Sequence, residues 1–218
     1  MATACQLALL NQESESAQDL SICVVEKGAE VGAHIISGAL FETTALDELF
    51  PDWKTMEAPL DTPITDDQFL YLSTHQNHIK VPHFLTPKPM RNSNQTYVIS
   101  LANLCRWLAQ QAESLGVEVF PGFAAASINY DESGRVTGVI TSDMGLDKQG
   151  EQKTSFEAGI ELKAKYTVFA EGSRGHLGKE MINRFSLDEG KPPQHYALGL
   201  KEIWELPAST SHQPGKVI

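Results

Sequence analysis

The residues that point most directly to chemistry lie near the start of the chain, where an apolar run ends on an acid. Residues 22–25 are Ile-Cys-Val-Val, Glu26 follows them, and the first glycine, Gly28, comes two residues later. In dinucleotide-binding folds, an acid at the end of a buried strand accepts hydrogen bonds from the ribose hydroxyls of adenosine. Those folds also carry a glycine-rich phosphate turn about 20 residues upstream of the acid. Glu26 is therefore either an ordinary exposed acid or part of a nucleotide site whose phosphate turn lies ahead of this sequence.

A second stretch with possible chemistry is TVFAEGSRGHLGK, at residues 167–179. Its glycines Gly172, Gly175 and Gly178 are spaced by three and stand between an apolar run and a predicted helix. Small residues let a backbone approach a ligand closely, and the free N–H groups of a helix N-terminus favour phosphate. The same glycines are equally compatible with a turn that serves only packing.

The hydrophobic pattern predicts the elements that position these two stretches. Residues 101–116 form the strongest amphipathic helix, with Leu101, Leu104 and Leu108 on one face and Gly116 at its end. Before it, the pattern predicts a helix at 2–11, a strand at 22–26, a helix at 43–50 capped by Thr43 or Thr44, a hairpin within the proline-rich stretch 57–93 and an extended segment at 97–100. After it, the pattern predicts three strands in 117–141, a loop or hairpin at 147–162, a strand with glycine-rich turn and helix at 164–185, and a strand from residue 195.

Composition and charge exclude several function classes. The formal net charge of −11 disfavours nucleic-acid binding, which depends on Lys and Arg contacts to phosphate. There is no run of about 20 apolar residues that would predict a transmembrane helix, and no convincing signal peptide. Cys5, Cys23 and Cys105 show no CxxC spacing, and Cys23 and Cys105 are predicted to be buried thiols in a reducing compartment.

Two further groups of residues carry little signal. His75, His78 and His83 lie within nine residues, but no carboxylate or cysteine completes a metal-ligand set, so structural or solvent-exposed roles are favoured and no metal site is predicted. No nucleophile–base pair and no paired catalytic carboxylates are legible, so no catalytic side chain is assigned. A bound cofactor would instead carry the chemistry.

Six longer stretches carry a family resemblance that covers nearly the whole chain. They are VVEKGAEVGAHIISGA, LDELFPDWK, APLDTPIT, LCRWLAQQAESLGVEVFPGFAAA, YTVFAEGSRGHLGKEM and HYALGLKEIWEL. Together they resemble the electron transfer flavoprotein–ubiquinone oxidoreductases. More distant likenesses are to FixC-type flavoproteins and geranylgeranyl reductases. The order of amphipathic helix, meander and strand before AEG is typical of flavoproteins of the glutathione-reductase type.

The resemblance implies a redox function for a longer parent protein. Members of this family carry FAD and a [4Fe–4S] cluster and pass electrons from reduced electron transfer flavoprotein to ubiquinone at a membrane. It implies that the chain is a fragment of roughly the first third, beginning just after the phosphate turn, and that the cluster cysteines lie beyond residue 218. It places the protein at the bacterial cytoplasmic membrane or the mitochondrial inner membrane.

The resemblance also implies which residues contact the flavin cofactor. Glu26 would meet the adenosine ribose with Lys27 beside it, and a strand near the adenine would contain Ala125. The remaining implied FAD-binding residues are Gly32, His34, Ser37 and Gly38 beside the flavin, and Ala170, Glu171 and Gly172 in a second FAD-contacting turn.

Residues 31–52 match a region that touches the membrane surface in this family. Their apolar side chains would supply a monotopic contact: Ile35, Ile36, Leu40, Phe41, Leu46, Leu49, Phe50 and the adjoining Trp53. The alternative is that these side chains cover the core of the protein, since a helix at 43–50 must bury one face in any fold.

The predicted fold is α/β: an FAD/NAD(P)-binding, Rossmann-like domain of the glutathione-reductase type with an inserted β-meander and a proline-rich β excursion, truncated at both ends. Its predicted parts are residues 1–56 and 96–190 as FAD-binding domain, 57–95 as the excursion, and 191–218 as the start of a quinone-binding domain. Two other functions stay open at this point. One is an FAD-dependent monooxygenase or a reductase of the geranylgeranyl-reductase or FixC type. The other is a cofactor-free interaction domain on the same scaffold.

Overall fold

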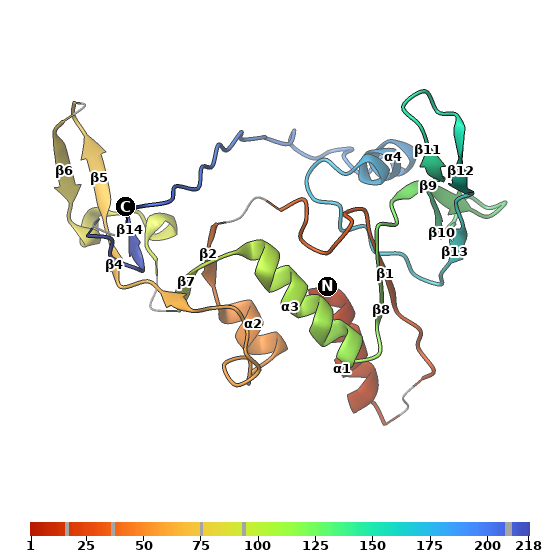
Figure 1. Cartoon of the computed structure of the whole chain (residues 1–218), viewed down its shortest axis with the longest axis horizontal. Coiled ribbons are helices and arrows are strands. Elements are labelled where there is room, and N and C mark those ends of the chain that lie inside the picture. Colours follow the sequence, from red (N-terminus) through yellow and green to blue (C-terminus); the bar gives the residue numbers. More distant parts are fainter. Residues whose placement is uncertain (16–17, 36–37, 75, 93–94, 208–210) are drawn as a thin grey trace. The chain divides into compact units, whose positions relative to one another are not determined.

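The computed structural model describes residues 1–15, 18–35, 38–74, 76–92, 95–207 and 211–218 (Figure 1). The chain forms two compact units. Unit 1 contains Met1–Val24, Val31–Val119 and Lys201–Ile218, and unit 2 contains Val25–Glu30 and Phe120–Leu200. Both helices and strands are present in the chain, which confirms the predicted α/β class.

Three helices build the core of unit 1: α1 (Ala2–Glu13), α2 (Thr44–Leu49) and α3 (Leu101–Ser114). Helix α3 packs against α1, as Figure 1 shows, and buries Leu104 and Trp107 at 2% and 6% exposure. Its Ser100 cap accepts a hydrogen bond from Asn103 N, and it ends before Gly116, whose φ of +86° suits glycine. The amphipathic pattern thus predicted this helix and its buried face correctly.

Aromatic side chains join α2 and the turn after it to this core. The rings of Phe50 and Trp107 meet edge to face at 5.6 Å, and those of Trp53 and Tyr97 do so at 5.8 Å. Asp47 holds the turn together by accepting hydrogen bonds from Trp53 Nε1 at 2.6 Å and Thr43 Oγ1 at 2.8 Å. These donors favour the ionised carboxylate and lower the pKa of Asp47.

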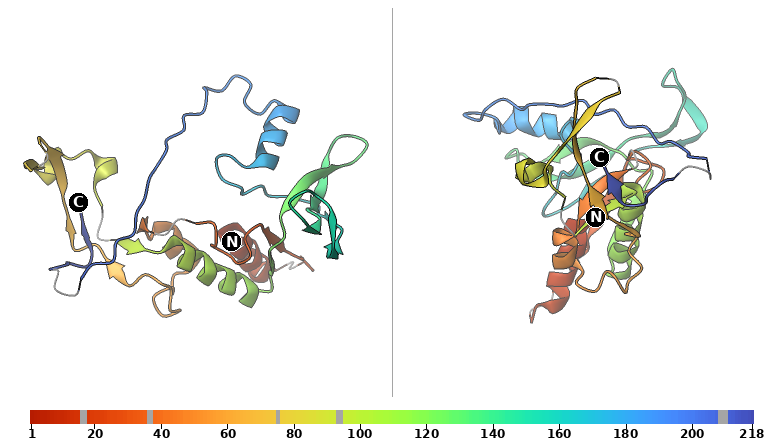
Figure 2. Two further views of the ribbon diagram at one scale, coloured as in Figure 1. Left: turned by 45° about the horizontal axis from the view of Figure 1, so that its top comes forward. Right: turned by 90° about the vertical axis from the view of Figure 1, so that its left-hand side faces the viewer.

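Short strands complete unit 1. β7 (Thr96–Ile99) lies between β2 (Ala39–Glu42) and β3 (Thr62–Pro63) and is antiparallel to both, and β4 (Asp66–Asp67) pairs in parallel with β14 (Lys216–Val217). β5 (Phe69–Leu72) and β6 (His78–Val81) form the predicted hairpin, which stands away from the three helices in Figure 2. The 3₁₀ turns η1 (His83–Leu85) and η2 (Lys88–Met90) follow it.

One strand pair leads from unit 1 into unit 2. β1 (Cys23–Glu26) pairs with β8 (Glu118–Pro121). In unit 1 the amide of Glu118 donates to the carbonyl of Ile22, and in unit 2 the amide of Gly122 donates to the carbonyl of Gly28. The two strands are therefore parallel, as in a dinucleotide-binding sheet.

Unit 2 is built on the predicted meander. β10 (Val136–Thr141) lies between β9 (Ala125–Tyr130) and β13 (Glu161–Lys163), and β11 (Met144–Leu146) pairs with β12 (Gln152–Glu157). Helix α4 (His176–Phe185) places Leu177 in a small core with Ile128 and Val139. The guanidinium of Arg184 lies 3.8 Å from the centre of the Tyr130 ring, which also fixes α4 on β9.

Three predictions about local structure are wrong. The segment 167–170 and the segment from residue 195 form no strand, because an extended segment becomes a strand only when another backbone pairs with it, and none does so in the described part of the chain. Cys23 is exposed and Cys105 half-buried, whereas Cys5 is fully buried. Burial raises the pKa of the Cys5 thiol, which behaves as a small core residue.

Candidate functional site

Glu26 is the last residue of β1, and its carboxylate has one engaged oxygen and one free oxygen. Oε1 accepts a hydrogen bond from the amide of Gly28 at 2.7 Å. Oε2 has no hydrogen-bond partner among the described residues. The carboxylate is thus oriented by its own backbone and keeps an acceptor for a ligand hydroxyl. This geometry fits a ribose-binding acid at the end of a strand.

Glu171, by contrast, is engaged on both oxygens by the start of α4. Oε2 accepts from the amide of Gly178 at 2.7 Å, and Oε1 accepts from the amide of Leu177 at 3.4 Å and lies 3.3 Å from His176 Nδ1. The carboxylate therefore acts as the cap of α4. The expectation that α4 presents free N–H groups to a phosphate is wrong for these two amides, because Glu171 already binds them.

The three glycines of this turn differ in how strongly local geometry requires them. A Cβ on Gly175 would lie 2.3 Å from Glu171 Cβ and 2.6 Å from its Oε2, so only glycine lets the carboxylate fold over the helix end. Gly172 has a φ of +77°, which side chains rarely adopt. A Cβ on Gly178 would meet Glu171 Oε2 at an ordinary 3.6 Å. Two of the three glycines are thus required by local geometry.

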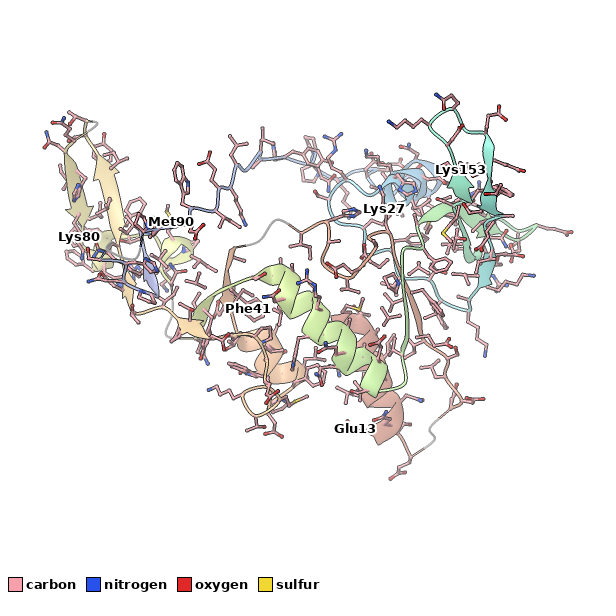
Figure 3. All side chains as sticks on the ribbon, in the orientation of Figure 1. Glu13, Lys27, Phe41, Lys80, Met90 and Lys153 are labelled. Atoms are coloured by element: carbon pink, nitrogen blue, oxygen red, sulfur yellow. The ribbon has the colours of Figure 1, made fainter. Side chains whose placement is uncertain are left out.

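The other predicted residues of unit 2 are less constrained. Lys27, which Figure 3 labels, follows Glu26 and is exposed. Ala125 begins β9 and faces Thr141 of β10 in the ladder. Ala170 is exposed just before the Glu171 turn. Unit 2 thus holds six of the predicted cofactor-binding residues, and Glu26 is the one whose acceptor is both oriented and free.

Unit 1 holds the remaining predicted residues. Gly32 is buried with φ +87°, and a Cβ there would lie 2.8 Å from the carbonyl oxygen of Ala102 at the start of α3. Gly38 is exposed, and its carbonyl oxygen accepts a hydrogen bond from Lys201 Nζ at 2.7 Å. His34 is exposed, and Ser37 lies outside the described residues. Gly32 therefore serves close packing against α3.

The predicted membrane-contact segment 31–52 contributes several of its apolar side chains to the core of unit 1. Leu46, Phe50 and the adjoining Trp53 are 3%, 7% and 4% exposed, so the alternative that they cover the core is confirmed for these three. Ile35, Phe41 and Leu49 are half-buried, Leu40 is exposed, and Ile36 lies outside the described residues.

Sequence reasoning missed a different apolar surface in unit 1. The hairpin β5–β6 and the turns η1 and η2 expose large apolar side chains: Tyr71, Leu72, Ile79, Phe84, Leu85 and Met90. The hairpin itself was predicted, but the sequence does not show that Tyr71, Leu72 and Ile79 remain exposed on it. Among the described residues, no group of His, Cys, Asp or Glu is suited to a metal ion. His78 and His83 are among the residues searched, whereas His75 lies outside the described residues. No described helix combines the length and apolar character needed to cross a bilayer.

Comparison with known proteins finds close relatives of this chain. An electron transfer flavoprotein-ubiquinone oxidoreductase from Pseudomonas aeruginosa is 52% identical over 219 aligned positions, which cover all of this chain. The chain therefore matches one part of this protein along its whole length. The mitochondrial relatives from Arabidopsis thaliana and Mus musculus are 46% and 47% identical over 100% and 94% of the chain. The chain spans 39% of the bacterial relative and 33% of the plant one. No protein-family model matches the chain.

Solved structures support the fold. The myxobacterial chondrochloren halogenase CndH, described as a variant of the FAD-dependent halogenases, matches with a TM-score of 0.50 and 15% identity over 82% of this chain and 36% of that one. A flavoprotein/dehydrogenase from Cytophaga hutchinsonii also matches with a TM-score of 0.50, at 17% identity over 90% of this chain and 41% of that one. The predicted FAD-binding, Rossmann-like fold class is thereby confirmed.

Proposed function

We propose that this chain is part of an enzyme that passes electrons from reduced electron transfer flavoprotein to ubiquinone. The observation that carries the proposal is the 52% identity, over the whole chain, to a bacterial protein whose name states that donor and that acceptor. The aligned positions cover both units. The activity belongs to the longer protein, of which this chain forms one part.

The part played by this chain is to bind FAD. Bound flavin supplies the chemistry, because it accepts and releases electrons singly or in pairs. Glu26 would hold the adenosine ribose through its free Oε2, while the Gly28 amide keeps the carboxylate in position. Glu171 would act one step removed, by fixing α4 and the preceding turn that carries Ala170 and Gly172. Gly32, His34, Ser37 and Gly38 would line the flavin side, with Ala125 near the adenine and Lys27 beside the ribose.

The iron–sulfur cluster of the parent protein would need ligands from elsewhere in that protein. A [4Fe–4S] cluster is held by four thiolates, and this chain has three cysteines. Cys5 is buried in the core of unit 1, and its pKa is raised by burial, which disfavours the thiolate. The residues of this chain therefore do not fit a cluster, and we assign none to it.

The membrane contact is better placed on the hairpin than on residues 31–52. The exposed apolar side chains of 69–90 include Leu72 and Phe84, at 72% and 76% exposure. Lys80, which Figure 3 labels, and Lys88 belong to the same stretch of sequence. Apolar side chains that enter an interface next to lysines are typical of monotopic contacts with anionic lipid. We infer that this surface attaches the parent protein to the bacterial cytoplasmic or mitochondrial inner membrane.

Polar contacts give this apolar surface a defined shape. The guanidinium of Arg91 donates to the carbonyl oxygens of Thr86 and Phe84, at 2.6 Å and 2.9 Å. The carboxylate of Asp67 accepts from both the backbone amide and the side-chain amide of Asn92, each at 2.9 Å. The bonds of Arg91 tie it to the turn that carries Phe84, and those of Asn92 tie the end of this segment to β4. The turn is therefore preorganised before any contact forms.

The function is tested in a hybrid protein, in which residues 1–218 replace the matching segment of the Pseudomonas aeruginosa relative. The purified hybrid should show a flavin absorption spectrum with about one FAD per chain, and should reduce ubiquinone when reduced electron transfer flavoprotein is supplied. Glu26→Ala should weaken FAD binding by about 10- to 100-fold, since a hydrogen bond to a charged group is removed. Glu132→Ala, at an exposed acid in the β9–β10 turn, is the matched control. A colourless hybrid, or equal losses in both variants, would contradict the proposal.

Membrane attachment has its own test. Flotation of the hybrid with vesicles containing anionic lipid should fall markedly for Phe84→Ser with Leu85→Ser, because both side chains are exposed apolar anchors. Tyr166→Ser with Val168→Ser removes comparably exposed apolar side chains from unit 2 and should leave flotation unchanged. Unchanged flotation of the first variant would remove the hairpin and its turns from the membrane contact.

A further inference from the structure

A groove on unit 1, between α1 and the α2 turn, takes no part in the site described above. It encloses about 350 Å³ and is lined by Gln6, Leu9, Glu13, Glu48, Leu49, Phe50, Pro51, Asp52 and Met56. All of these residues belong to unit 1, and α1 and α2 are in contact. The groove is therefore a feature of one unit and does not depend on how the two units are placed.

The groove combines an apolar floor with an acidic rim. Leu9, Leu49 and Met56 are half-buried against the core, so their remaining exposed surface forms the floor. Leu10, which is 53% exposed, lies on α1 one turn from Gln6 and Glu13 and extends the apolar surface at the edge. Figure 3 shows Glu13 at the far end of α1.

The charges of the rim are all negative and all unengaged. Glu13, Glu48 and Asp52 are exposed, and none of their carboxylates forms an ion pair or hydrogen bond in the described part of the chain. No Lys, Arg or His is among the lining residues. Some other acids of the protein are engaged, since Asp47, Asp67, Asp131 and Glu171 each bind donors of this chain. The rim thus offers three acceptors with no internal use.

This combination selects one kind of occupant. An anionic membrane surface and a nucleic acid would both be repelled by three carboxylates. A protein segment with Lys or Arg around an apolar side chain would match both parts, since the apolar side chain covers the floor and the cations meet the rim. Such rim charges act mainly on the rate of encounter and on its salt dependence.

We propose that this groove docks a basic, apolar-tipped segment of the electron-donor protein, the electron transfer flavoprotein. This inference rests on the proposed function, which supplies the identity of the donor. The rim attracts the positively charged segment over a distance, and the floor of Leu9, Leu49 and Met56 then receives its apolar side chain. The groove sets how fast the donor associates, while the flavin site receives the electrons.

The test reverses the three rim charges in the hybrid protein: Glu13→Lys, Glu48→Lys and Asp52→Lys together. The matched control carries Glu132→Lys, Glu151→Lys and Glu157→Lys, which change the net charge equally at exposed positions of unit 2. Steady-state rates are measured with reduced electron transfer flavoprotein as donor, from about 20 to about 300 mM salt. The rim variant should lose at least about 10-fold in kcat/KM at low salt with kcat retained, and the loss should shrink as salt rises. The control should change less than about 2-fold.

Each other outcome has a definite meaning. If the unmodified hybrid fails to oxidise the donor, the proposed function fails. If the hybrid is active and the rim variant equals the control, the groove is not the docking site. If the rim variant unfolds at a lower temperature than the control and keeps its kcat/KM, the groove is covered by another segment of the same polypeptide, and the inference is overturned. Flavin content and circular dichroism of both variants show that they are folded.

Discussion

Helix α3 and the segment 195–206 both follow a regular apolar pattern, yet only the helix buries it. Leu104 and Trp107 of α3 are 2% and 6% exposed, whereas Leu198 and Leu200 are 91% and 90% exposed. In α3, apolar residues recur every three or four positions. In the segment they alternate through Tyr196, Leu198 and Leu200, as in a strand. The difference therefore lies in what each pattern requires from the rest of the chain.

A helix satisfies its own backbone and needs only a surface on which to pack, whereas a strand needs a second backbone. The partners of α3 all lie in unit 1: α1, the Phe50 ring and the strands around Ile99. The segment 192–206 forms no backbone hydrogen bond with any described residue. Its alternation therefore predicts a strand that this chain cannot complete within its described part.

The largest effect that tests this comparison comes from two leucines. Leu104→Ala should lower the free energy of unfolding of the 218-residue chain by about 2–5 kcal/mol, because it opens a cavity in the core. Leu198→Ala should change it by less than about 0.5 kcal/mol, because that side chain is already in water. Urea unfolding followed by circular dichroism measures both. Equal losses would mean that residues 195–206 are packed in solution and that the contrast with α3 is false.

The contrast also explains which parts of the fold were predictable. The helices expected at 2–11, at 101–116 and after the glycine-rich turn, together with the strands of the meander, were predicted from local sequence signals. The structure has them as Ala2–Glu13, Leu101–Ser114, His176–Phe185 and β8–β10. The strands expected at 167–170 and from 195 failed, because strand formation depends on pairing that no single segment encodes. The same limit applies to the hairpin β5–β6, whose existence was predicted but whose exposed apolar side chains were not.

The candidate site was predictable in type but not in detail. Glu26 at the end of a short apolar run was identified from its neighbours, and the structure leaves one of its oxygens free. The sequence did not show that Glu171 turns back onto the amides of Leu177 and Gly178, because a reversed side chain leaves no periodic signal. Gly175, whose missing Cβ makes room for that carboxylate, was the available clue.

Two glycines have almost the same positive φ, but one is packed against a helix and the other is exposed. Gly32 has φ +87° and lies against Ala102 of α3. Gly38 has φ +88°, and a Cβ at this position would have no described atom within 4 Å outside its chain neighbours. Gly38→Ala should cost only the left-handed conformation, about 1–2 kcal/mol. Gly32→Ala adds a 2.8 Å contact with a backbone oxygen and should cost about 1–3 kcal/mol more. Urea midpoints of both variants give the difference, and equal losses would show that the start of α3 yields freely.

Helix α4 tests whether a less deeply buried helix depends more on its cap. It buries one residue, Leu177, while α3 buries five. Glu171→Ala should destabilise α4 by about 0.5–2 kcal/mol, since the Leu177 and Gly178 amides lose their acceptor. Ser100→Ala, at the cap of α3, should leave that helix in place, because packing holds it. Amide hydrogen exchange of each first turn measures the effect. If both helices lost amide protection equally, the importance of a helix cap would not depend on how many side chains the helix buries.

The smallest expected effect is the pH dependence of stability that arises from Asp47, whose hydrogen bonds hold the turn after α2. The folded-state pKa of Asp47 is lowered, because Trp53 Nε1 and Thr43 Oγ1 donate to its carboxylate. A lowered pKa stabilises the fold above the unfolded-state value of about 4, and this contribution is lost as pH falls through the folded-state value.

The Asp47→Asn variant isolates that contribution. The difference in unfolding free energy between the parent chain and the variant should be constant from pH 7 to about 5 and shrink below about 4. Tryptophan emission reports it directly, because Trp53 and Trp107 lie in the same core. Asp131 also has a lowered pKa but is present in both proteins, so its effect cancels in the difference. A difference that stays constant down to pH 3 would show that the two hydrogen bonds do not favour the charged carboxylate.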